Sequence, residues 1–133
     1  MVDRQPPRPT DSELAILGVL WERGPSTVRD VHDAIQRGRP SGQTTGYTTV
    51  LKLLQIMTEK GLVTRDERAR SHVYRARWSE DTTQRQLVTD LLDRAFGGSA
   101  ARLVMQALDV SPASPEELKE IRRLLDERRG ARK

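Results

Sequence analysis

The apolar residues of this chain change their spacing near residue 62 and again near residue 78, and this change limits the folds that the chain can adopt. In the run 71–78, Tyr74 and Trp78 alternate with Arg75 and Arg77, as in a half-buried β-strand. Residues 62–65 have the same β character, and the residues between the two runs are mostly charged. The pattern predicts a β-hairpin with a basic tip.

On both sides of this hairpin the apolar residues follow the 3.6-residue period of helices. The first predicted helix begins with a capping box formed by Thr10 and Glu13. A short extended stretch precedes the second helix, and a segment with two glycines and a proline precedes the third. The predicted helices span residues 10–24, 28–37 and 46–60 before the hairpin, and 80–96, 100–108 and 115–129 after it. We therefore expect a mainly α-helical protein with one small β-hairpin.

Positive charge is concentrated in the part of the chain up to Trp78. The 133 residues carry a net charge of +4 at pH 7. Up to Trp78 there are 13 Lys and Arg against 9 Asp and Glu, whereas the remainder has 10 of each. The first part is therefore suited to a polyanionic partner, and the second part consists of neutral amphipathic helices that need a packing surface.

The order helix, short strand, helix, turn, helix and hairpin is that of a winged helix, a variant of the helix-turn-helix DNA-binding motif. The polar side of the third helix is expected to enter the major groove, where its side chains meet base edges. The hairpin arginines are expected to meet phosphates or a minor groove. The predicted DNA-contacting residues are Thr48, Lys52 and Gln55 on the polar face, Tyr47 and Thr49 at the helix entrance, and Arg65, Arg68 and Arg70 around the hairpin tip.

The last three helices carry apolar stripes but only one aromatic residue, Phe96, so they have little with which to form an independent core. We expect these stripes to pack against a second subunit in a homodimer. The predicted dimerisation residues are Leu87, Leu91, Leu92, Phe96, Leu103, Val104, Leu108, Leu118, Ile121 and Leu125. The predicted organisation is a disordered arm at 1–9, a winged-helix DNA-binding domain at 10–78, a three-helix dimerisation domain at 79–129 and a basic tail at 130–133.

Several classes of site have no counterpart in the sequence. There is no cysteine, which removes disulfides, thiolate metal sites and cysteine nucleophiles. His32 and His72 lack a carboxylate at a metal-ligand spacing, and no catalytic constellation or phosphate-binding glycine motif is present. No run of apolar residues reaches the length of a membrane span, and the N-terminus lacks a signal peptide. We expect a cytoplasmic protein that is not an enzyme, does not insert into a membrane and has no metal or cofactor.

Six short strings in register resemble the penicillinase-repressor (BlaI/MecI) family of winged-helix transcriptional repressors, from about Thr10 to Arg129. The strings in the first part are Thr10–Leu17 with Leu20 and Trp21, Gly46–Val50, and Lys60–Val63 with Tyr74. Those in the second part are Phe96–Ser99, Leu103 with Val104, and Ser114–Leu118 with Leu124 and Leu125.

The resemblance implies a homodimer that binds a palindromic operator and represses transcription, commonly of resistance or stress genes. In one branch of the family a membrane sensor-protease signals an antibiotic, and the repressor is cut within its dimerisation domain. The matching bond in this chain is Gln106–Ala107, where the Asn-Phe pair of that branch is missing. A copper-sensing branch uses a cysteine-rich motif, which this chain lacks.

One alternative from another class of function stays open. A winged helix can serve as a protein-interaction module, with its third helix docking a partner protein instead of a DNA groove. Leu51 and Ile56 are apolar residues that flank the predicted DNA face, and they favour this alternative. A steep loss of DNA affinity with salt would argue against it.

Overall fold

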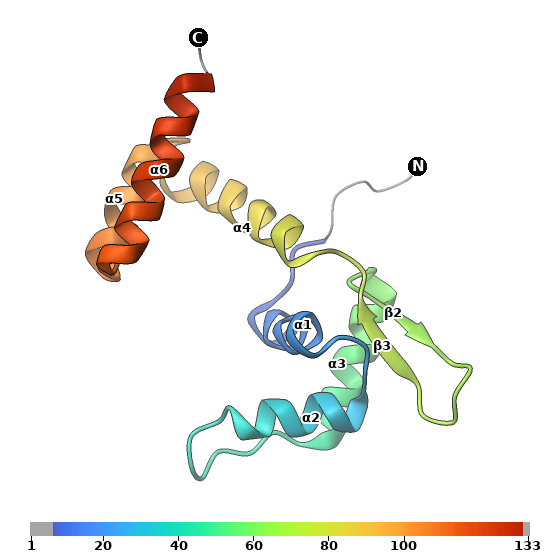
Figure 1. Ribbon diagram of the computed structural model, residues 1–133. Helices are drawn as coiled ribbons and strands as arrows, with labels where there is room; N and C mark the ends of the chain where they lie inside the picture. The colour runs from blue at the N-terminus through green and yellow to red at the C-terminus, as the bar shows by residue number, and fades with distance from the viewer. Residues whose placement is uncertain (1–6, 132–133) are drawn as a thin grey trace. The chain divides into compact units, whose positions relative to one another are not determined.

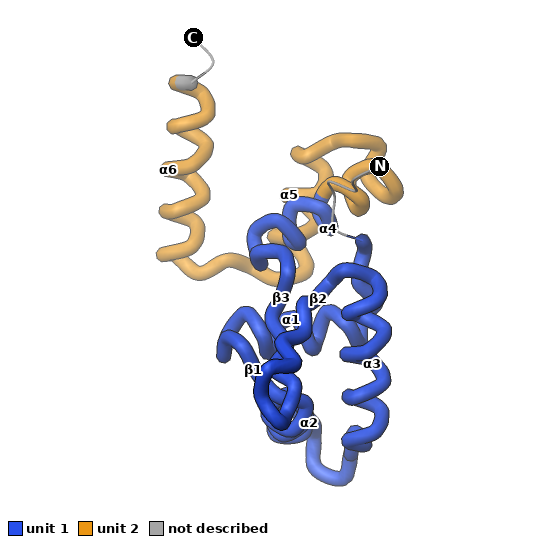
Figure 2. The backbone as a smooth tube through the Cα atoms, turned by 90° about the vertical axis from the view of Figure 1, so that its right-hand side faces the viewer, with its two compact units in different colours: residues 1–88 blue, residues 89–133 orange. Residues whose placement is uncertain are grey.

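The computed structural model describes residues 7–131, which form six helices and three strands (Figure 1). They divide into two compact units, with the boundary between Val88 and Thr89 inside one helix (Figure 2). In chain order the elements are α1 (Asp11–Arg23), β1 (Ser26–Thr27), α2 (Val28–Arg37), α3 (Tyr47–Lys60), β2 (Val63–Asp66), β3 (Val73–Ala76), α4 (Glu80–Ala95), α5 (Ala100–Val110) and α6 (Pro115–Ala131). Most of the predicted arm, residues 1–6, and the end of the predicted tail, residues 132–133, lie outside the described residues.

In the first unit, three helices pack with a three-stranded antiparallel sheet of strand order β1-β3-β2. The extended stretch expected before α2 is β1, which pairs with β3 through Ser26 and Tyr74. The core draws on all three helices and the sheet; its fully buried members include Ile16, Val31, Leu54 and Tyr74. This arrangement is a winged helix in which β2 and β3 form the wing, as the sequence predicts.

A partly buried ion pair ties the start of α1 to the end of α3. The predicted capping box is present, with the Thr10 N–H donating to Oε1 of Glu13 at 2.8 Å. The same oxygen accepts a hydrogen bond from Nζ of Lys60 at 2.6 Å, although the Glu13 side chain is only 3% exposed. Burial is the largest single influence and raises the pKa of Glu13, but the bonds from Lys60 and Thr10 together outweigh it and lower that pKa. Glu13 is therefore held as a carboxylate that fixes one end of α3.

The predicted return run 71–78 is shortened at both ends to β3, Val73–Ala76, and the end of α3 explains the second of these departures. Gly61 adopts a left-handed conformation (φ 84°), and the Leu62 N–H donates to the Met57 carbonyl at 2.9 Å, which closes the helix as in a Schellman motif. The prediction that the return strand extends to Trp78 was wrong, because β3 ends at Ala76. The Trp78 indole N–H instead donates to the Gly61 carbonyl at 3.0 Å, which draws the chain toward the end of α3.

The helices of the second unit expose most of their apolar side chains. None of the residues 89–130 is buried, whereas the first unit has a well-buried core. The side chains of Met105 on α5 and Leu125 on α6 are 66% and 64% exposed. The chain on its own therefore leaves apolar surface uncovered in this unit.

Candidate DNA-binding site

Helix α3 presents one polar, solvent-facing side and one core-facing side. Its core side buries Val50, Leu54 and Met57, which anchor the helix to the first unit. The sequence predicted five DNA-contacting residues here, and all five have exposed side chains: Tyr47, Thr48, Thr49, Lys52 and Gln55. A helix held from one side only, with small hydroxyls, an amide and an ammonium group on the other, has the chemistry needed to read base edges.

The N-terminus of α3 differs from those of α1 and α2. Helices α1 and α2 both begin with a capping box, in which a threonine side chain accepts a backbone N–H of the first turn. Helix α3 begins after Gly46, which has no side chain and forms no such bond. The first backbone N–H groups of α3 therefore have no side-chain acceptor from the cap, which leaves them suited to an anion such as a phosphate.

Side chains of α2 hold the segment that leads into α3. Gln36 accepts the Thr45 N–H at 2.9 Å and donates to the Gln43 carbonyl at 2.8 Å. Nε2 of His32 lies 2.9 Å from the Thr45 carbonyl oxygen. His32 therefore helps to hold the entrance of α3 in place.

Arg29 is a cation at this entrance that the sequence analysis did not assign to the site. Its guanidinium lies over the ring of Tyr47, 5.4 Å from the centroid, and the His32 ring meets the same Tyr47 ring edge-on at 6.0 Å. Arg29 is an exposed residue near the start of α2. Its contact with a residue 18 positions further on depends on how α2 and α3 pack.

Within the described part of the chain, two of the three wing arginines predicted to meet DNA are paired with a carboxylate, and the third is not. Arg68 is 88% exposed, yet its guanidinium donates to Asp66 at 2.7 and 3.0 Å. This hydrogen bonding holds the pKa of Asp66 well below its usual range. Arg65 pairs with Glu67 at 2.6 Å, while Arg70 forms no salt bridge with any residue in the range 7–131. Of the three, Arg70 is therefore the one whose charge is not compensated within the wing.

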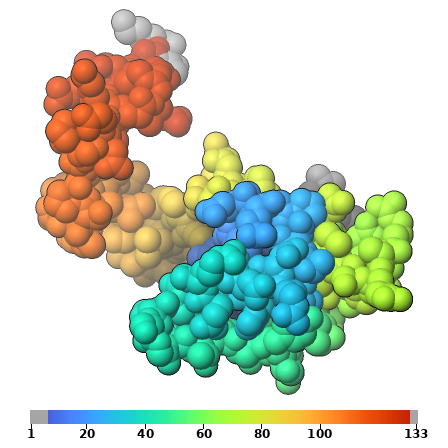
Figure 3. All heavy atoms as spheres, turned by 60° about the horizontal axis from the view of Figure 1, so that its bottom comes forward, coloured from blue at the N-terminus to red at the C-terminus, as the bar shows by residue number. Residues whose placement is uncertain are grey.

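Both candidate DNA-contacting regions stand on the surface of the first unit. In the space-filling view of Figure 3, the residues that follow α2 (turquoise) and the hairpin (yellow-green) are both exposed. The wing tip, residues 67–72, is exposed throughout. The entrance of α3 and the wing are thus accessible to a large partner.

The predicted dimerisation residues lie on α4, α5 and α6, apart from Phe96, which directly follows α4. Leu91, Val104, Leu118 and Leu125 are exposed, and the other six are half-buried: Leu87, Leu92, Phe96, Leu103, Leu108 and Ile121. In the second unit, three large apolar side chains outside the predicted stripes are also exposed: Met105, Val110 and Leu124. Gln106 and Ala107, the bond matched to the cleavage site of relatives, are both exposed within α5.

The described residues contain neither a candidate metal site nor a candidate membrane span. Among residues 7–131 there is no group of three or more His, Cys, Asp or Glu side chains that could hold a metal ion. Within the same range, no helix combines the length and the apolar character needed to span a bilayer.

Comparison with known proteins relates the chain to transcriptional repressors. The penicillinase repressor family model matches residues 9–127. The transcriptional regulator BlaI of Mycobacterium tuberculosis is 33% identical over 118 residues, covering 88% of this chain and 82% of the relative. The penicillinase repressor of Bacillus licheniformis is 23% identical over 127 residues, covering 96% of both chains.

Two solved structures share the fold. The solution structure of the DNA binding domain of the repressor BlaI has a TM-score of 0.50 at 20% identity, covering 60% of this chain and 93% of that domain. The complex structure of hsRosR-S4 has a TM-score of 0.54 at 17% identity, covering 94% of this chain and 93% of that one. The resemblance found in the sequence is thereby confirmed, and the chain belongs to the penicillinase repressor family.

Proposed function

We propose that this chain represses transcription by binding, as a homodimer, an operator that contains an inverted repeat. The observation that carries the proposal is α3, which is anchored by buried residues on one side and presents Thr48, Thr49, Lys52 and Gln55 to solvent on the other. Membership of the penicillinase repressor family supports the same function. The relative from Bacillus licheniformis, named for repression of a penicillinase, supports resistance genes as targets.

In this proposal the polar face of α3 enters the major groove and reads sequence. Lys52 is suited to the acceptor atoms O6 and N7 of guanine. The Gln55 amide can donate to N7 of adenine and accept from its N6 amino group, while the threonines offer hydroxyls and methyl groups. The Arg29 and Arg70 guanidiniums and the free N–H groups at the start of α3 bind the phosphates on either side. The phosphate contacts set the orientation of the protein, and the α3 side chains set its specificity.

A homodimer would cover the apolar side chains of α5 and α6. Two-fold symmetry then predicts two half-sites whose centres lie about one or more helical turns apart, roughly 10 bp or a multiple. The test is the Leu125→Asp variant, in which a charge replaces an exposed apolar side chain. We expect it to sediment as a monomer at concentrations where wild type is a dimer. If the variant is still a dimer, Leu125 is not part of the interface.

The proposal gives the chain no catalytic role and places it in the cytoplasm, where it meets the operator. Release of the operator through a membrane sensor-protease rests only on the family resemblance. The exposed position of Gln106 and Ala107 is compatible with cleavage. However, the helical backbone of α5 would have to open before a protease could bind it in an extended form.

The first experiment selects genomic fragments with the purified protein at about 150 mM salt and excess competitor DNA, then footprints the retained fragments. We expect protection of an inverted repeat that overlaps a promoter. Retention that is independent of sequence and lost with modest salt would contradict the proposal. In that case the partly exposed Ile56 on α3 would favour a partner protein instead.

Variants of α3 then test how the operator is read. Lys52→Ala should weaken operator binding by about tenfold or more, as expected for the loss of a base contact, and should weaken nonspecific binding less. Thr49→Ala should change binding in the same direction. Lys119→Ala is the matched control, since it removes an exposed lysine from α6 and should leave operator affinity unchanged. Equal operator affinity for Lys52→Ala and wild type would remove Lys52 from the recognition surface.

A further inference from the structure

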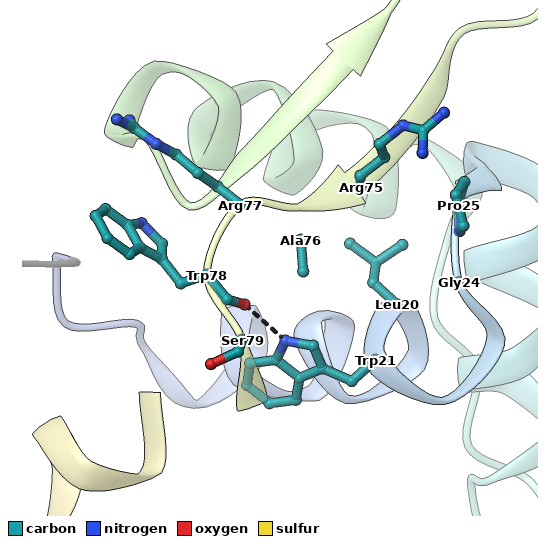
Figure 4. Close-up of a pocket in the computed structure, with 9 residues that line it drawn as sticks. All are labelled: Leu20, Trp21, Gly24, Pro25, Arg75, Ala76, Arg77, Trp78 and Ser79. Atoms are coloured by element: carbon teal, nitrogen blue, oxygen red, sulfur yellow. Dashed lines mark hydrogen bonds between the residues drawn. The ribbon is translucent and has the colours of Figure 1, made fainter. Parts of the chain in front are cut away.

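Trp78 is the joint between β3 and α4, and two indole hydrogen bonds hold it to the winged helix. Nε1 of Trp21, near the end of α1, donates to the Trp78 carbonyl at 3.0 Å (Figure 4). Nε1 of Trp78 donates in turn to the Gly61 carbonyl at the end of α3, also at 3.0 Å. Residue 78 is therefore bound to two helices of the first unit that are far apart in sequence.

The residue before the joint is held as well. The Arg77 N–H donates to the Leu62 carbonyl at 3.0 Å, and the Arg77 guanidinium lies over the Trp78 ring, 5.1 Å from its centroid. A Cβ atom on Gly61 would lie 3.0 Å from Nη1 of Arg77, so this side chain passes close to the turn after α3. The chain thus leaves the sheet along one defined path.

The residues after the joint continue this path into α4. The Ser79 hydroxyl accepts the Thr82 N–H at 3.0 Å, and the Ser79 carbonyl accepts the Thr83 N–H at 3.1 Å. Thr83 is only 2% exposed, and the first unit extends to Val88, so the first two turns of α4 are part of the winged-helix unit. Helix α4 then runs on without a break to Ala95.

The indole bonds matter because packing holds these rings on one side only: Trp21 packs against the core, but both rings are partly exposed. Trp21 and Trp78 are only half-buried, and they border an open pocket of about 350 Å³ that Leu20, Pro25 and Ala76 also line (Figure 4). A ring with free space beside it can turn unless a directional bond fixes it. Each indole N–H has only one such bond to give, and both are given to backbone carbonyls around the joint.

We propose that Trp21 and Trp78 are positioning residues that fix the direction of α4 on the winged helix, and thereby set the half-site spacing that the dimer accepts. This inference rests on the proposed function, because spacing has a meaning only for a dimer on an inverted repeat. Neither residue needs to touch DNA for this role. Each acts through the helix that connects the winged helix to the rest of the chain.

The length of α4 makes the joint sensitive. Its 16 residues span about 24 Å at 1.5 Å per residue. A rotation of about 10° at the first turn therefore moves the far end of the helix by about 4 Å, which is close to the rise of one base pair. A loose joint would let the dimer fit operators of several spacings, and a held joint restricts it to one.

The test compares full operators with half-sites. Trp21→Phe and Trp78→Phe each keep an aromatic ring and remove one indole hydrogen bond. The probes are duplexes carrying the footprinted inverted repeat with its natural spacing, the same repeat with one or two base pairs added or removed, and a single half-site. We expect half-site affinity to stay within about twofold of wild type, while the preference for the natural spacing falls at least about fivefold.

Two further variants separate positioning from general stability. Ile16→Val trims a fully buried residue of α1 away from the joint, and it should keep the spacing preference despite a lower melting temperature. Insertion of two glycines between Trp78 and Ser79 leaves both indoles in place but frees α4, and it should lose the preference as the Trp variants do. If both Phe variants fail to fold, this insertion still tests the premise that the direction of α4 sets the spacing, and an unchanged preference overturns the inference.

The outcomes distinguish the inference from the function on which it rests. If wild type binds an inverted repeat and the glycine insertion or the folded Trp variants keep the same spacing preference, the positioning role is refuted and the repressor function stands. If Ile16→Val loses the preference to the same extent, the effect is one of stability and the inference is again refuted. If wild type shows no preference for an inverted repeat, the proposed function itself fails.

Discussion

The ion pair between Asp66 and Arg68 gives a quantitative prediction for DNA binding by the wing. Asp66 accepts hydrogen bonds from the Arg68 guanidinium at 2.7 and 3.0 Å, so the two charges cancel within the wing. The Asp66→Asn variant should free Arg68 to bind a phosphate. Each additional phosphate contact makes the slope of log affinity against log salt steeper by about 0.9. Between about 50 and 200 mM salt the variant should therefore lose about 3.5-fold more affinity than wild type does.

The same reasoning ranks the arginine variants. Arg70→Ala should flatten the salt slope by about 0.9, because Arg70 has no salt-bridge partner among residues 7–131. Arg68→Ala should have a clearly smaller effect, because Asp66 already compensates that charge. In the Asp66→Asn background, however, Arg68→Ala should have the full effect, and the double variant should return to nearly the slope of wild type.

The assay is fluorescence anisotropy with a nonspecific duplex at five salt concentrations. Asp109→Asn is the matched control, because it removes one exposed carboxylate from α5 and changes the net charge equally. If Asp66→Asn and Asp109→Asn change the slope by the same amount, net charge explains the effect and the wing contact is refuted. Equal effects of Arg68→Ala and Arg70→Ala in the wild-type background would show that the ion pair does not compensate Arg68.

Three further predictions concern the scaffold that holds α3. Lys60→Met leaves the Glu13 carboxylate buried without its partner, and because Lys60 is one-third exposed we expect a loss of about 2 kcal/mol in the free energy of unfolding at pH 7. Because the native pKa of Glu13 is lowered, its pairing stabilises wild type above the pKa of the unfolded state, and this stabilisation is lost as the pH falls through the native pKa. Urea melts at pH 7 and pH 3.5 should therefore show that the stability difference between wild type and Lys60→Met becomes smaller in acid. Leu54→Ala removes a fully buried side chain of α3 and should cost about 3 kcal/mol by the same measurement, whereas a cost below about 1 kcal/mol would mean that the site is not well packed. Gly61→Ala forces a side chain into a left-handed backbone conformation (φ 84°) and should cost about 1 to 2 kcal/mol, so an unchanged urea midpoint would contradict the strain argument.

Much of the local structure follows from short-range signals. The capping box of Thr10 and Glu13 acts within a few residues and lies where the pattern predicted. The third predicted helix ends at residue 60, as α3 does, and the Gly61 cap that closes it is a local signal of the same kind. The exposed face of α3 follows from the same kind of signal, because a 3.6-residue period that places Val50, Leu54 and Met57 in the core must place Lys52 and Gln55 outside.

The candidate site was less predictable in its electrostatics. The sequence showed three arginines around the hairpin tip and could not tell which of them are paired. Arg68 and Asp66 are two residues apart, but whether their side chains meet depends on the conformation of the turn after β2. Arg29 became part of the site only through the packing of α2 beside α3, which brings it over Tyr47.

Taken by itself, the sequence determined which residues form helices and strands, which faces are apolar and which family the chain resembles, because periodicity, caps and turns are encoded by neighbours along the chain. The tertiary structure alone decided that Trp78 leaves the sheet and donates to the Gly61 carbonyl, and that Trp21 holds the Trp78 carbonyl in turn. These bonds join residues that are 17 and 57 positions apart. A hydrogen bond over such a separation depends on the three-dimensional path of the backbone, which no local pattern specifies.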